Sequence, residues 1–172
     1  ETAIKILLGC STLYLDAGTT AIAVAKALAR SSWRPVWVVT NSWHIAEILG
    51  KSGIRHELLG GEVDYRSLAI SGPTAIETLT KYHFDWAVLS CDAITSNGSI
   101  RLAHPPEAHL KRIAIKNSSK SMLLVSHDKF GQTSHVETAT LADFNVCITD
   151  AHIDEISGLC CQLNVELVIA EH

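Results

Sequence analysis

The chain has 172 residues, of which 47% are hydrophobic and 19% charged, and its formal net charge is −4. This length and composition suit one globular domain with a sizeable core and exclude a disordered chain. The acidic balance provides no electrostatic footprint for DNA or for an anionic membrane surface, and no apolar run approaches the ~20 residues that span a bilayer. Any nucleic-acid contact would therefore come from a part of the protein outside these residues.

The N-terminal residues 1–9 read as the tail of a helix that is already under way, and the sequence does not begin with Met. We therefore expect a piece of a longer protein. The five cysteines form no CxxC pair, and their odd number indicates a reduced, cytoplasmic protein.

From residue 13 onward, short apolar runs alternate with polar turns and helical patterns. Strands are predicted at residues 13–16, 36–40, 56–59, 86–90, 122–126, 146–149 and 165–170. Helices are predicted at residues 20–30, 44–51, 75–82, 107–116 and 155–163. This alternation predicts a doubly wound α/β fold, with a parallel sheet covered on both faces. No long linker interrupts it, so we expect one domain over residues 1–172, with a small appendage near residues 60–71.

The turn after the first strand is the most informative motif. Asp16 is followed by Ala-Gly-Thr-Thr, and the next residues are helical. A small-residue turn at a helix start leaves backbone N–H groups free at the positive end of the helix dipole, and Gly18, Thr19 and Thr20 would add space and hydroxyl donors for an anion. The alternative is an ordinary turn, in which Gly18 supplies an unusual backbone angle and a threonine caps the helix.

Polar residues also follow the other predicted strands. They are Thr40 and Asn41 after the second strand, Gly61 and Glu62 after the third, Asp92 after the fourth and Lys129 after the fifth. The carboxyl ends of parallel strands meet at one edge of a sheet, where ligands of open α/β proteins bind. Each turn alone also fits a helix cap, a tight turn or a solvated cation. Together they favour a phosphorylated sugar or polyol as the ligand. Its hydroxyl groups could donate hydrogen bonds to Asp16, Glu62 and Asp92.

The helix predicted from residue 107 carries Glu107 and Lys111 four residues apart on one face. They either form an ion pair worth ~0.3–0.5 kcal/mol or both contact the ligand. His104, Glu107 and His109 are the best metal candidates, but they match no ligand spacing. We therefore predict no metal and no cofactor.

Several short motifs occur in a specific order. They are Asp-Ala-Gly-Thr-Thr (16–20), Val-Val-Thr-Asn-Ser (38–42), Leu-Leu-Gly-Gly-Glu (58–62), Gly-Pro (72–73), Phe-Asp (84–85), Asp-Lys-Phe-Gly (128–131) and Ile-Thr-Asp (148–150). In this order they resemble the C-terminal sensor domain of DeoR-family bacterial transcriptional repressors. The resemblance implies a Rossmann-like sheet similar to that of ribose-5-phosphate isomerase and coenzyme A transferases.

The resemblance also implies a function and a site. Such a domain binds a phosphorylated sugar effector, forms a homo-oligomer (dimer or tetramer) and acts on operator DNA through an N-terminal winged helix-turn-helix, which is absent here; it contacts no membrane and is not an enzyme. The positions that match the family's phosphate side are Gly18, Thr19, Thr20, Asn41 and Lys129. Those that match its pocket lining are Asp16, Gly61, Glu62, Glu107 and Lys111.

Two other functions remain open at this point. A sugar-phosphate isomerase on the same fold would need a general base and a group that stabilises an enediolate, for which Glu107 with Lys111, or Asp92, are the candidates. Residues 94–99, however, lack the Lys-Gly-Gly-Gly loop of such isomerases. A plain oligomerisation module would bind no sugar phosphate.

Overall fold

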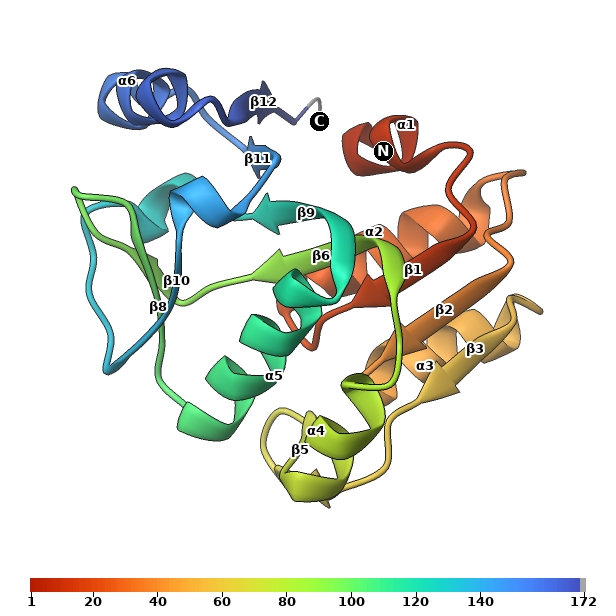
Figure 1. Cartoon of the computed structure of the whole chain (residues 1–172). Coiled ribbons are helices and arrows are strands. Elements are labelled where there is room, and N and C mark those ends of the chain that lie inside the picture. The colour runs from red at the N-terminus through yellow and green to blue at the C-terminus, as the bar shows by residue number, and fades with distance from the viewer. Residues whose placement is uncertain (171–172) are drawn as a thin grey trace.

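A seven-stranded parallel sheet forms the centre of the computed structural model, which describes residues 1–170 (Figure 1). Residues 171–172 of the expected domain lie outside the described residues. The strands lie in the order β12-β11-β9-β6-β1-β2-β3. Their bounds are Thr12–Leu15 (β1), Trp37–Thr40 (β2), His56–Leu58 (β3), Phe84–Ser90 (β6), Ser118–Leu124 (β9), Val146–Thr149 (β11) and Glu166–Ile169 (β12).

Helices cover both faces of the sheet because successive side chains of its strands point to opposite sides. In β1, Leu13 and Leu15 face one side and Tyr14 faces the other, and all three are fully buried. The first side packs against α1 (Thr2–Leu7), α2 (Thr19–Arg30) and α3 (Trp43–Lys51). The second packs against α4 (Pro73–Leu79), α5 (Pro105–Lys116) and α6 (Asp154–Leu163).

The predicted α/β fold is confirmed, and each predicted strand and helix is present with its ends shifted by at most a few residues. The helical tail expected at residues 1–9 is α1. The expected appendage is a hairpin of β4 (Glu62–Val63) and β5 (Ile70–Ser71). Among residues 1–170, no helix is both long and apolar enough to cross a membrane.

Further short elements had no counterpart in the prediction. They are β7 (Ala93–Ile94), β8 (Ser99–Leu102), β10 (Val136–Thr140) and the 3-10 turns η1 (His127–Lys129) and η2 (Leu141–Asp143). The three strands form a small antiparallel sheet in the order β10-β8-β7. Strands of two to five residues are too short to establish a hydrophobic period, so the sequence pattern did not reveal them.

The order in which the chain adds strands to the sheet reverses between β1 and β6, although all of these strands are parallel. It runs from β1 outward through β2 and β3, then returns to the other side of β1 and continues through β6, β9, β11 and β12. The crevice beyond the carboxyl ends of β1 and β6 is therefore the topological switch point, where open α/β sheets bind ligands. Asp16 begins the turn after β1, and its N–H donates to the Val88 carbonyl of β6 at 3.1 Å.

Candidate functional site

A cleft of about 210 Å³ opens at this switch point. Its walls come from the start of α2, the turn after β6, the end of β8, the start of α5 and the η1 turn. Six of the predicted site residues line it: Gly18, Thr19, Asp92, Glu107, Lys111 and Lys129. They come from four separate turns or helix starts, so the fold brings together residues far apart in the sequence.

A buried ion pair between Asp16 and Lys111 lies at the base of this cleft. The side chains of Lys111 and Asp16 are only 4% and 1% exposed. Asp16 Oδ2 accepts from Lys111 Nζ, from the Ser90 N–H at 3.1 Å and from Ser90 Oγ at 2.8 Å. Lys111 Nζ also donates to the Ser90 carbonyl at 2.8 Å. The network joins β1, β6 and α5, and Asp16 itself lies beneath the cleft rather than among the residues that line it.

This pairing replaces the local one considered from the sequence. No ion pair or hydrogen bond joins Glu107 to Lys111 in the part of the chain that the structure describes; Lys111 instead pairs with a residue 95 positions away. The predicted ion pair between Glu107 and Lys111 is therefore wrong. Glu107 lines the cleft, and its carboxyl group makes no hydrogen bond or ion pair among residues 1–170.

Gly18 is required for space and not for its backbone angle. Its φ of −119° and ψ of 156° are ordinary extended values, so the expected unusual angle is wrong. A Cβ atom at this position would lie 1.9 Å from Ser90 Oγ and 2.7 Å from Ser90 Cβ. Only glycine lets the start of α2 approach β6 this closely, and this closeness places α2 beside the Asp16–Lys111 network.

The first turn of α2 presents free backbone donors. Gly18 is the N-cap and no side chain caps the helix, so the expected threonine cap is wrong. Within residues 1–170, the N–H groups of Thr19, Thr20 and Ala21 have no acceptor, whereas Ile22 N–H donates to the Gly18 carbonyl at 2.9 Å. Together with the helix dipole, such groups favour an anion.

The walls of the cleft combine positive and negative side chains. Lys129 Nζ donates to the Cys91 carbonyl at 2.7 Å, and Asp92 Oδ2 accepts from the Ala103 N–H at 2.8 Å. Burial raises the pKa of Glu107 above its ordinary value; the nearby Lys111 opposes this effect, and Asp16 adds to it. The cleft thus offers donors for an anionic group and acceptors for hydroxyl groups.

Thr20, Thr40 and Asn41 do not line the cleft. The Thr20 side chain faces a separate groove on the other side of α2. Thr40 is buried, and its Oγ1 accepts from the Ser42 N–H at 3.1 Å. Asn41 is buried as well: its Oδ1 accepts from the Tyr14 hydroxyl at 3.0 Å, and its Nδ2 donates to the Ile70 carbonyl at 3.1 Å. Asn41 therefore fastens the β4–β5 hairpin to the end of β2.

Gly61 and Glu62 belong to that hairpin and lie outside the cleft too. Gly61 has a φ of +147°, and a Cβ there would lie 2.3 Å from the Ser71 carbonyl oxygen, so this glycine serves the close pairing of the hairpin. The Glu62 side chain is exposed and lies near Gly72. The hairpin reaches the cleft instead through Ser67, between its two strands.

The sequence reasoning missed several residues that line the cleft. They are Ala17, Ser67, Ser90, Cys91, Leu102 and His104. Ser67 and Leu102 belong to hairpins whose strands give no periodic signal, whereas Ser90 and Cys91 end a predicted strand and were available as candidates. His104 was considered only as a metal ligand; within residues 1–170, no group of three or more His, Cys, Asp or Glu residues has the arrangement of a metal site.

Comparison with known proteins identifies the family. The sequence matches the family described as the DeoR C-terminal sensor domain over residues 1–151. The chain belongs to this family. It is 34% identical to the glycerol-3-phosphate regulon repressor of Escherichia coli strain K12, in an alignment that covers 82% of this chain and 56% of that protein. It is also 34% identical to the transcriptional repressor GlcR of Bacillus subtilis strain 168, covering 92% and 61%.

The relatives and the solved structures provide different information. The sensor domain spans little more than half the length of these two repressors. The L-fucose operon activator of Haemophilus influenzae is 29% identical, covering 98% of this chain and 68% of that protein. Ribose 5-phosphate isomerase A of Neisseria gonorrhoeae is only 14% identical, with a TM-score of 0.54 over 78% of this chain and 51% of that one. This likeness shows the fold alone, so the sensor domain groups with regulators and not with the isomerases.

Replacing Lys111 tests the buried network. Lys111→Met leaves the Asp16 carboxylate buried without its cation, and we expect a loss of about 3–5 kcal/mol in the free energy of unfolding, measured by urea denaturation. Lys26→Met, at an exposed position of α2, should change it by less than about 0.5 kcal/mol. Adding Asp16→Asn to Lys111→Met should recover part of the loss. A cost for Lys111→Met equal to that of Lys26→Met would contradict the supporting role of the pair.

The raised pKa of Glu107 predicts how the free energy of unfolding changes with pH. Its raised pKa means that the folded chain holds this proton more tightly than the unfolded chain, so its contribution to stability falls as the pH rises from the ordinary glutamate pKa through the raised value. Glu107→Gln should therefore raise the free energy of unfolding relative to the parent at pH 8 more than at pH 4. Glu77→Gln is the control: bonding to Lys81 lowers the pKa of Glu77, so this variant should bring no gain at pH 8. A Glu107→Gln gain that does not change with pH would exclude the buried charge as its cause.

Proposed function

We propose that the cleft binds a phosphorylated sugar or polyol, and that its occupancy changes the affinity of the whole regulator for operator DNA. The observation that carries this proposal is the pairing, in one cavity, of the uncapped start of α2 and Lys129 with the carboxylates of Glu107 and Asp92. A bare anion would be repelled by the carboxylates, and a neutral sugar would leave the N–H donors unused. A molecule with a phosphate at one end and hydroxyls at the other satisfies both sets of groups.

The charges in the cleft orient this ligand. The phosphate would lie against the amides of residues 19–21 and near Lys129, where the helix dipole and the ammonium both favour negative charge. The hydroxyls would donate to Glu107 and Asp92, which line the same cleft. Lys111 lines the cleft and pairs with Asp16 beneath it, so we assign these two residues to holding its walls in place and not to direct recognition.

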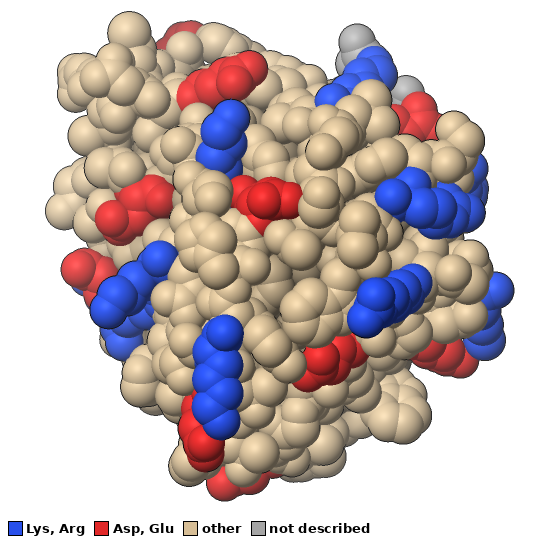
Figure 2. Space-filling view, turned by 45° about the vertical axis from the view of Figure 1, so that its right-hand side comes forward, with Lys and Arg blue, Asp and Glu red and all other residues tan. Residues whose placement is uncertain are grey.

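In this proposal, DNA binding is carried out by a part of the protein outside the residues described. The net charge is −4, and Figure 2 shows a face on which Lys and Arg side chains alternate with Asp and Glu, without a continuous basic area. We propose that operator DNA is bound by an N-terminal domain of the full-length, cytoplasmic regulator, acting as a homo-oligomer. The ligand would shift the balance between two arrangements to the extent that it binds them with different affinities. The relatives include repressors and an activator, so either sign of response is compatible with this domain.

A thermal-shift titration tests the proposal. Glycerol 3-phosphate and a set of pentose and hexose phosphates are each compared with the unphosphorylated compound, and at least one phosphorylated member should raise the melting temperature. Lys129→Ala should weaken the binding of that member by about tenfold or more, because a hydrogen bond between charged groups contributes about 1.5–3 kcal/mol. It should change the effect of the unphosphorylated analogue much less.

Lys26→Ala is the matched control, since Lys26 is exposed on α2 and does not line the cleft. It should leave the titration unchanged. If no phosphorylated compound stabilises the chain, or if Lys129→Ala binds the stabilising compound as tightly as the parent does, the proposed phosphate position is refuted.

A further inference from the structure

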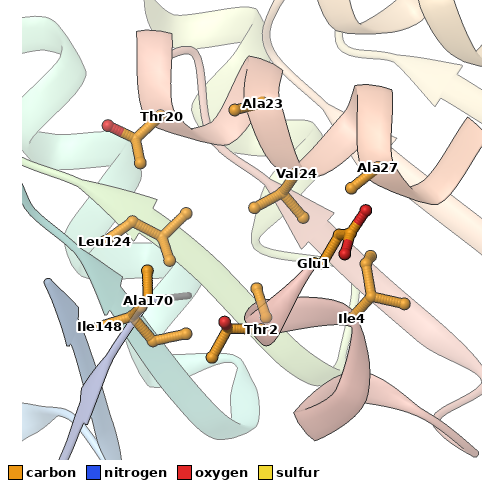
Figure 3. Close-up of a pocket in the computed structure, with 11 residues that line it drawn as sticks. Glu1, Thr2, Ile4, Thr20, Ala23, Val24, Ala27, Leu124, Ile148 and Ala170 are labelled. Atoms are coloured by element: carbon orange, nitrogen blue, oxygen red, sulfur yellow. The ribbon is translucent and has the colours of Figure 1, made fainter. Parts of the chain in front are cut away.

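A second hollow lies on the opposite side of α2 from the cleft. We call it the α1–α2 groove; it has a volume of about 150 Å³. Figure 3 shows its lining, which includes Glu1 just before α1, Ala23 and Ala27 of α2, Leu124 and Ile148 of the sheet, and Ala170. An adjoining hollow of about 220 Å³ shares Thr20, Leu124, Ile148 and Ala170 with it and extends to Asp150. The two together form a mostly apolar channel from the start of α1 to the carboxyl edge of the sheet.

We propose that this groove holds the polypeptide segment that precedes Glu1 in the full-length regulator. The occupant would be an apolar-faced stretch of the same chain, leading toward the DNA-binding part. This inference rests on the proposed function only where it connects the docked segment with a ligand in the cleft. The docking itself can be tested without any ligand.

The first argument is the amount of chain that lies outside the sensor domain. The sensor covers 56% and 61% of the two repressors described above, and its family is defined as the C-terminal part of such proteins. The remaining two fifths therefore lie mainly before the sensor. Glu1 is itself on the wall of the α1–α2 groove, so a preceding segment enters the folded domain at this place.

The second argument is the shape and chemistry of the groove. The face of α2 that lines it carries Thr20, Ala23, Val24 and Ala27, at the three- and four-residue spacings that place side chains on one face of a helix. The two alanines are small enough for another backbone to approach closely. Ala23 is exposed in the sensor alone, and Leu124 and Ile148 supply an apolar floor. An apolar segment would bury this surface, and Glu1 is the one charged side chain among the described residues that line the groove.

The third argument is the position of α2 between the two hollows. Its first turn contributes Gly18 and Thr19 to the cleft and Thr20 to the groove. A ligand that binds the amides of this turn would therefore move or stiffen the wall against which the preceding segment packs. Gly18 lies so close to Ser90 that no side chain would fit between them, so this turn already packs directly against β6 on its other side.

Thiol labelling tests the docking. Ala23→Cys is made in a Cys161→Ser background, which removes the exposed native thiol, in both the 172-residue chain and the full-length protein. The rate of reaction with N-ethylmaleimide is followed by peptide mass spectrometry. In the full-length protein we expect a rate about tenfold or more slower than in the chain, because a covered thiol reacts only through the fraction of molecules in which its cover is open. Ala170→Cys, on the opposite wall, provides a second position with the same expectation.

Lys26→Cys is the matched control on an exposed position of α2 that does not line the groove, and it should react equally in both proteins. Equal rates for Ala23→Cys and Ala170→Cys in the two proteins would overturn the proposal. Protection that is present in the 172-residue chain and increases with its concentration would also overturn it, because a second copy would then be the occupant. Since no ligand is added, neither outcome depends on whether the cleft binds a sugar phosphate.

Discussion

The ion pair between Asp16 and Lys111 is the constraint on which the site depends. Two opposite charges that are almost completely removed from water are tolerated only when they are paired and their remaining hydrogen-bonding capacity is satisfied, and Ser90 meets that need with its N–H, hydroxyl and carbonyl groups. The pair fixes the end of β1, the end of β6 and the middle of α5 relative to one another. Gly18 then allows α2 to begin directly above it, and the cleft is the space that these fixed elements leave.

In this arrangement, the residues that hold the cleft together differ from those that would contact a ligand. Asp16 and Lys111 neutralise each other, so the groups left to meet a ligand are the free amides of α2, Lys129, Glu107 and Asp92. Burial raises the pKa of Glu107, whose carboxyl group makes no hydrogen bond among residues 1–170, and a ligand hydroxyl would supply one. The same helix start separates the cleft from the α1–α2 groove, so it would connect a ligand in the cleft with the preceding segment that we propose to bind in the groove.

The fold, and the gathering of six predicted residues around one cleft, could be predicted from the sequence because both depend on local patterns. Apolar runs alternating with helices imply a doubly wound sheet, and the polar turns after its strands must gather at one edge. The roles of Asn41 and Thr40 could not be predicted. A hairpin with two-residue strands takes up the side-chain amide and the carbonyl of Asn41, and the Thr40 hydroxyl accepts from the Ser42 N–H instead. Nor could the partner of Lys111: Glu107 is four residues away, but a residue 95 positions distant in the sequence is closer in the fold. Gly18 was identified as important for the wrong reason, since its role depends on the approach of Ser90, which only the three-dimensional structure shows.

The most direct test of the central claim is a ¹H–¹⁵N NMR titration of the 172-residue chain with the phosphorylated compound that stabilises it most. Binding of phosphate at the start of α2 predicts that the amide resonances of Thr19, Thr20 and Ala21 show the largest downfield proton shifts, because these N–H groups gain a charged acceptor, and that Lys129→Ala diminishes them. Saturable binding that leaves these three amides unchanged, with its largest shifts elsewhere in the chain, would contradict the account.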